Sequence, residues 1–317
     1  MRERAAVWAT RATPLAMASS VGALMLLSAN RGLDVVDEGY MLRLIDNPQA
    51  TRPAGDVYLF GFVVHPIYRL LGDDVAALRL CGYLAVAAVS GLLCREFLAL
   101  VRDRGLCPPK AQALTATSAV VASSLFVFSF NVATPAYRSV TLVGLMLTAA
   151  GIARAGRRRP VSGGALVGVG GWTTFVGKPT SAAALFVITL VVVVVLRLVS
   201  RRLVCAAAGF ATVAAAMTLA IAQLSPVAAV TYLARGLSQS DRLGSHSSVA
   251  MMLGLTNLRL EGLLALGPLF VLPVVLGELS LRSVPTRWRM PIQLASVVTI
   301  IAAIAVTCAY ASRTLGP

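Results

Sequence analysis

Two adjacent carboxylates, Asp37 and Glu38, are the residues best suited to chemistry in this sequence. Valines precede them, and Gly39 and Tyr40 follow. In a partly desolvated setting adjacent carboxylates repel each other, so they favour a proton or a cation between them. Such a pair can act as a general base or hold a hard divalent cation. The alternative interpretation is structural, with Asp37 capping a short helix that starts near Gly39.

Three basic residues, Arg79, Arg138 and Lys178, stand near the predicted ends of apolar segments. An arginine within lipid is costly and is therefore a functional candidate by default. The alternative is that its long side chain extends to the lipid headgroups. Lys178 lies between a glycine and a proline, where it is either a ligand-binding cation or a residue of a simple turn.

The two longest predicted external loops supply the remaining candidates for an acceptor site. Tyr40, Arg52 and His65 belong to the first loop, and Arg242 and His246 belong to the second. A lone histidine is more often a packing or headgroup residue than a ligand. The second loop, rich in serine and glycine, is equally typical of a solvated connection.

The composition indicates that a membrane positions these residues. Hydrophobic residues make up 57% of the 317 residues, and only 13% are charged, whereas a soluble domain has about 25% charged residues. A chain so poor in charge cannot cover its own surface in water. We therefore predict an all-α polytopic transmembrane helix bundle, a single domain over residues 1–317, with the lipid bilayer as its surroundings.

The net charge of +15 comes almost entirely from arginines that lie in short clusters between apolar segments. Such clusters follow from the positive-inside rule, so we expect no nucleic-acid partner. The five cysteines show no spacing that indicates a disulfide framework or a zinc site.

Nine segments approach the length of about 20 residues that a bilayer requires. They are residues 14–28, 75–100, 111–130, 137–153, two within 161–196, 203–222, 258–279 and 291–310. Arginine clusters recur after every second segment, which predicts a cytoplasmic amino terminus and an external carboxyl terminus in the cytoplasmic membrane. The same parity predicts two short spans that meet near Lys178. The first segment is also compatible with a signal peptide, but we favour an uncleaved span.

The first external loop, about residues 31–74, holds seven of the 13 acidic residues. Within it, residues 57–72 are apolar but short, and they are interrupted at His65-Pro66. Because both neighbours of this segment are predicted to be external, we expect it to lie along the outer interface as an amphipathic segment.

The order of these features resembles that of the GT-C glycosyltransferases, in particular the protein mannosyltransferase and aminoarabinose transferase group. An Asp-Glu pair follows the first span, an apolar segment ends in Leu-Gly, and the second span begins with a sequence similar to Ala-Arg-Leu-Pro. Residues 136–138 and 168–180 are similar to two later segments of these enzymes, and Lys178-Pro179 match a Lys and a Pro there. The resemblance covers about residues 1–200.

This resemblance implies transfer of a sugar from a polyprenyl-phosphate donor to a glycan, lipid or protein acceptor at the extracytoplasmic face. Asp37 then activates the acceptor, and Glu38 supports it or helps to hold a divalent cation, the one candidate cofactor. Lys178, with Arg79 or Arg138, then binds the donor phosphate.

The sequence also departs from the family. Arg52-Pro53 stands where many members have Lys-Pro-Pro, and nine spans are fewer than most members have. If the resemblance holds, the chain is a compact member, a diverged or inactive one, or one that needs a partner subunit. The alternative function is non-enzymatic, as a transporter or flippase of lipid-linked intermediates or as an accessory subunit. A transporter places ionisable residues near the bilayer midplane, and the predicted span centres have almost none.

Overall fold

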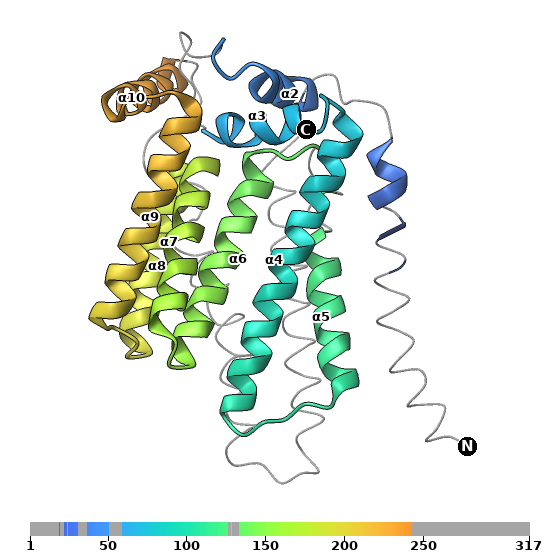
Figure 1. Ribbon diagram of the computed structural model, residues 1–317, viewed down its shortest axis with the longest axis vertical. Coiled ribbons are helices and arrows are strands. Elements are labelled where there is room, and N and C mark those ends of the chain that lie inside the picture. Colours follow the sequence, from blue (N-terminus) through green and yellow to red (C-terminus); the bar gives the residue numbers. More distant parts are fainter. Residues whose placement is uncertain are drawn as a thin grey trace, which may run out of the picture. The chain divides into compact units, whose positions relative to one another are not determined.

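The computed structural model describes residues 19, 22–23, 25–30, 37–50, 59–125, 128 and 133–242. All of them belong to one compact unit, Met1–Leu243. The regular elements of this part of the chain are all helices, as predicted (Figure 1). The spans predicted at 258–279 and 291–310 lie outside the described residues, so the number of nine spans stays a prediction.

Among the described residues, three helices are long and apolar enough to cross a membrane: α4 (Val75–Asp103), α6 (Tyr137–Gly156) and α9 (Arg201–Ala222). Three shorter helices pack alongside them: α5 (Lys110–Leu125), α7 (Pro160–Gly177) and α8 (Pro179–Val195). These helices lie where spans were predicted, and the structure supports a helical membrane protein.

The apolar stretch 161–196 forms two helices that are separated by a single residue. Helix α7 ends at Gly177, α8 begins at Pro179, and Lys178 between them has an extended backbone (φ −152°, ψ 101°). Proline has no N–H to donate and its ring blocks the preceding turn, so it ends one helix and suits the first position of the next. The break predicted near Lys178 is therefore present.

Three helices lie across one end of the bundle: α2 (Asp37–Asp46), α3 (Phe60–Leu70) and α10 (Pro226–Arg242) (Figure 1). We call this end, together with the adjoining ends of α4, α6 and α7, the site end. The opposite end, where α6 and α8 finish and α7 and α9 begin, is the basic end. The segment predicted to lie along the interface forms α3 and does not run along the bundle.

A hydrophobic cluster holds the site end together. Its buried members come from six helices and from the residues that adjoin them: Met41, Leu44, Ile45, Leu59, Phe60, Phe62, Val64, Tyr68, Leu78, Ala136, Val176, Ala222, Leu224, Ala229 and Tyr232. Burial of each large apolar side chain stabilises the fold by about 1.5–3 kcal/mol. The cluster therefore fixes α2 and α3 against the ends of α4, α6, α7 and α9.

Helices α6 and α7 pack with their backbones in direct contact. A Cβ atom on Gly151 would lie 2.7 Å from the carbonyl oxygen of Gly163, and one on Gly163 would lie 2.7 Å from that of Gly151. Small residues allow membrane helices to approach this closely. The Thr148 hydroxyl in the same interface donates to the carbonyl oxygen of Gly144, one turn earlier (3.0 Å). Its polar group thus needs no water.

A buried acid joins α4 to the end of α6 at the basic end. The Glu96 side chain is 1% exposed and accepts hydrogen bonds from Arg154 (2.5 Å), Arg157 (2.9 Å) and Arg95 (3.0 Å). Arg157 also donates to Asp103 (2.9 Å), and this bond raises the pKa of Arg157. Sequence analysis did not single out Glu96, because two of its three partners, Arg154 and Arg157, lie at the end of another helix.

Candidate active site

Asp37 and Glu38 are the first two residues of α2, and the helix directs their carboxylates into different environments. Asp37 is exposed, whereas Glu38 is 2% exposed. Both acids lie in the first helical turn, where the helix dipole favours negative charge. The short helix expected from near Gly39 therefore exists, and Asp37 itself begins it.

Glu38 forms a buried, two-pronged ion pair with Arg79 of α4. The Arg79 Nε donates to one carboxylate oxygen (2.9 Å) and its Nη2 to the other (2.7 Å). Its Nη1 donates to the carbonyl oxygen of Ala29 (2.7 Å), the residue that follows the first predicted span. Arg79 is 3% exposed. Paired, parallel hydrogen bonds of this kind fix orientation as well as charge, so Arg79 ties α2 and the backbone at Ala29 to α4.

Thr134, which precedes α6, completes the surroundings of Glu38. Its backbone N–H donates to a Glu38 carboxylate oxygen (3.1 Å), and its hydroxyl group contacts the same oxygen. Thr134 is fully buried. Nothing in the sequence distinguished this threonine, because its role depends on a contact across 96 residues.

These contacts revise two of the predicted roles. Arg79 was a candidate donor-phosphate ligand, but Nε, Nη1 and Nη2 each donate to a protein oxygen. Glu38 was a candidate second catalytic acid or cation ligand, but Arg79 neutralises it. Of the two acids, only Asp37 therefore keeps a negative charge that could attract a divalent cation. Within the described residues, no group of three or more His, Cys, Asp or Glu side chains could hold a metal ion.

Lys178 and Arg138 also lie at the site end. The backbone N–H of Leu59, just before α3, donates to Val176 at the end of α7 (3.1 Å), two residues before Lys178. The Lys178 side chain is partly buried and makes no ion pair or hydrogen bond with any described residue. Arg138 is exposed, and its Nε donates to the hydroxyl of Tyr137 (2.9 Å).

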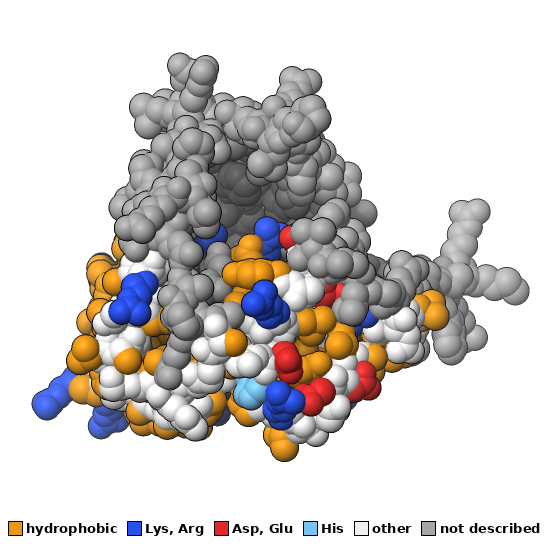
Figure 2. All heavy atoms as spheres, turned by 90° about the horizontal axis from the view of Figure 1, so that it is seen from above, with side chains coloured by type: hydrophobic (Ala, Val, Ile, Leu, Met, Phe, Trp, Pro, Cys, Tyr) orange, Lys and Arg blue, Asp and Glu red, His pale blue; other side chains and the backbone are white. Residues whose placement is uncertain are grey.

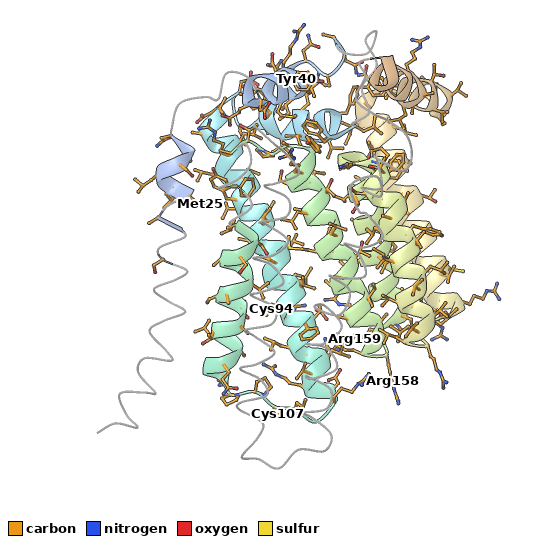
Figure 3. All side chains as sticks on the ribbon, turned by 180° about the vertical axis from the view of Figure 1, so that it is seen from behind. Met25, Tyr40, Cys94, Cys107, Arg158 and Arg159 are labelled. Atoms are coloured by element: carbon orange, nitrogen blue, oxygen red, sulfur yellow. The ribbon has the colours of Figure 1, made fainter. Side chains whose placement is uncertain are left out.

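The candidates for an acceptor site lie in different places. Tyr40 is 50% exposed on α2, at the site end (Figure 3). The Nδ1 of His65 lies 2.7 Å from the carbonyl oxygen of Ile45. A carbonyl only accepts, so Nδ1 carries the proton and His65 joins α3 to α2. Arg242 is the last residue of α10, while Arg52 and His246 lie outside the described residues.

Acidic and basic side chains lie side by side on the outer face of the site end (Figure 2). Arg69 of α3 pairs with Asp46 (3.3 Å) and with Asp73 (2.7 Å), and all three side chains are about half exposed. Burial raises the pKa of Tyr68, and the nearby Asp46 and Asp73 raise it further. Tyr68 therefore stays neutral at ordinary pH. Sequence analysis did not single out this cluster.

Comparisons with protein-family models, with curated proteins and with solved structures find no match. The geometry itself limits the chemistry of the site. The exposed carboxylate of Asp37 and two cations, Lys178 and Arg138, lie at the same end of the helix bundle. This arrangement suits proton abstraction next to a bound anion.

Proposed function

We propose that the protein is a membrane glycosyltransferase of the GT-C type. It moves a sugar from a polyprenyl-phosphate donor to a glycan, lipid or protein acceptor at the extracytoplasmic face. The main supporting observation is that the two acids of the pair differ in burial and in contacts. Glu38 is locked by Arg79 and Thr134, which holds α2 in place, and the adjacent Asp37 is left exposed at the site end.

In this proposal Asp37 is the general base. The acceptor hydroxyl oxygen bonds to the anomeric carbon of the sugar while the bond from that carbon to the phosphate oxygen breaks. The hydroxyl proton passes to Asp37, and polyprenyl phosphate leaves with the electron pair. Because the reaction is a single displacement, the anomeric configuration inverts.

Lys178 and Arg138 stabilise the charge that develops on the leaving phosphate. Lysine is a compact cation suited to a single phosphate oxygen, and arginine adds a planar fork of donors. Lys178 has no acid partner among the described residues, so binding the phosphate breaks no existing ion pair. Arg79 is a positioning residue in this scheme, because it acts on Asp37 only through Glu38 and α2.

The test is transfer of radiolabelled sugar from polyprenyl-phosphate donors by membranes that contain equal amounts of inserted protein. Asp37→Asn keeps the shape of the side chain and removes its charge. We expect turnover to fall on the order of 10²–10⁴-fold, with little change in donor affinity. The matched control is Asp46→Asn, an exposed acid at the other end of α2, which should retain most of the activity.

Lys178→Met separates donor binding from proton transfer. We expect it to weaken the apparent affinity for the donor more than that for the acceptor. Full transfer activity in Asp37→Asn would overturn the proposed reaction and favour a transporter or an accessory subunit. An unchanged donor affinity in Lys178→Met would remove Lys178 from the phosphate site.

A further inference from the structure

A groove of about 490 Å³ lies at the basic end, between the first turns of α7 and the lower part of α9. Its lining residues are Arg159, Pro160, Val161, Ser162, Ala165, Arg202 and Phe210. The lining is thus apolar except for one hydroxyl and two guanidinium groups. Val161 and Phe210 are 54% and 47% exposed, so the groove opens to the surroundings of the bundle.

Neither of the two arginines of this groove has an acid partner among the described residues. The acids of the same end, Glu96 and Asp103, are engaged by other arginines. Arg159 and Arg202 are exposed, and neither forms an ion pair or a side-chain hydrogen bond with any described residue. The groove therefore has two positive charges and no negative charge in its lining.

The start of helix α7 adds partial positive charge to that of the two arginines. Helix α7 begins at Pro160, and its N-cap residue Arg159 makes no side-chain capping hydrogen bond. The first N–H groups of a helix have no partner within the helix, and Pro160, Val161 and Ser162 of this first turn are lining residues of the groove. Figure 3 shows Arg159 at the end of the bundle opposite Tyr40. The groove is therefore distinct from the candidate active site.

We propose that this groove binds an anionic phospholipid of the membrane leaflet at the basic end. The headgroup phosphate lies between the guanidinium groups of Arg159 and Arg202, and an acyl chain lies along Val161, Ala165 and Phe210. A pair of arginines beside an apolar surface matches the two-part chemistry of such a lipid, a charged headgroup and an acyl chain. A free phosphate ion would use the arginines but leave the apolar lining without a partner.

The experiment measures retention of phosphatidylglycerol by the full-length protein, purified in detergent, with native mass spectrometry. The test variant is Arg159→Gln/Arg202→Gln. The matched control is Arg102→Gln/Arg104→Gln, which removes two exposed arginines from the same end but outside the groove. Phosphatidylcholine tests the need for negative charge, and glycerol 3-phosphate competes as a soluble phosphate without acyl chains.

We expect the wild type to retain one phosphatidylglycerol and to bind phosphatidylcholine more weakly. The groove variant should lose about 30-fold in apparent affinity, since each arginine near an anionic membrane surface contributes roughly fivefold. The control should lose much less. An equal loss in both double variants would overturn the site in favour of diffuse surface charge. Displacement by an equal concentration of glycerol 3-phosphate would overturn the assignment to a lipid. Neither outcome bears on the proposed sugar transfer.

Discussion

At the site end one buried glutamate meets one arginine, whereas at the basic end one buried glutamate meets three. Glu38 and Arg79 are both almost fully buried, so their charges cancel within the protein. Glu96 is equally buried, but the side chains of Arg154 and Arg157 are 19% and 17% exposed. A buried glutamate paired with arginine therefore has a different role at each end. It fixes a helix beside a candidate site at one end, and it anchors an excess of positive charge at the other.

The largest effect that we expect concerns which end faces the outside of the cell. The test uses a chain in which Cys81, Cys94, Cys205 and Cys308 are serine, so that only the exposed Cys107 of the basic end remains. In intact cells an impermeant maleimide should label Asp46→Cys in this background. It should label Cys107 only after permeabilisation, because the positive-inside rule places the basic end in the cytoplasm.

Thr180→Cys, near the turn at Lys178, should be labelled like Asp46→Cys. Labelling of only one of these two positions would contradict the predicted topology. Labelling of Cys107 in intact cells would reverse the orientation and place the proposed active site in the cytoplasm.

The next effect concerns the stability that the buried pair provides. Glu38→Gln leaves the guanidinium of Arg79 charged and without its carboxylate. Loss of one partner of a buried ion pair costs about 3–5 kcal/mol, which should appear as a large loss of thermal stability in detergent. The control is Glu38→Gln/Arg79→Met, in which both charges are removed and most of the stability should return. If Glu38→Gln alone is as stable as the wild type, the ion pair is hydrated and not buried.

A smaller effect is expected at the basic end. In Glu96→Gln, Arg157 keeps its hydrogen bond to Asp103, and the partly exposed arginines can extend toward the headgroups. We expect a loss of about 1–3 kcal/mol, measured in the same melting experiment. The Asp103 side chain is half exposed, so Asp103→Asn should lower the stability by less. A loss from Glu96→Gln equal to that from Glu38→Gln would show that exposure does not distinguish the two ends.

The smallest effect is expected at the surface of the site end. Arg69→Gln removes two ion pairs whose side chains are 44–55% exposed. Exposed pairs of this kind contribute at most about 1 kcal/mol, and salt screens them. The stability difference between Arg69→Gln and the wild type should therefore shrink further in high salt. A salt-independent loss would indicate that Arg69 packs against its neighbours in addition to pairing with them.

The sequence predicted the helices better than it predicted their contacts. The break at Lys178 followed from the basic clusters on both sides of residues 161–196, which require an even number of crossings between them. Its position followed from the glycine and the proline on either side of Lys178. The position of α3 across the bundle end followed from the shortness of residues 57–72 and from the interruption at His65-Pro66. Both predictions depend on lengths that a bilayer imposes, and such lengths can be read along the chain.

The pairings could not be read in the same way. Arg79 and Glu38 lie 41 residues apart, and Thr134 enters from a third segment. The sequence contains several external acids that could pair with an arginine, so only the packing of α2 against α4 decides between them. The same reasoning explains why Arg79 was first assigned to a phosphate. Exposure of Asp37 next to a buried Glu38 depends on the exact rotation of one short helix.

The glycine contact between α6 and α7 has a mechanical consequence. Where helices touch through their backbones, few bulky side chains lie between them that could change rotamer and let one helix slide along the other. We therefore expect this pair to behave as one stiff rod that runs between the two ends of the bundle. If the bundle opens to admit a bulky substrate, we therefore expect helices α2 and α3 to move. These helices lie across the end of the bundle and are held there by side-chain packing.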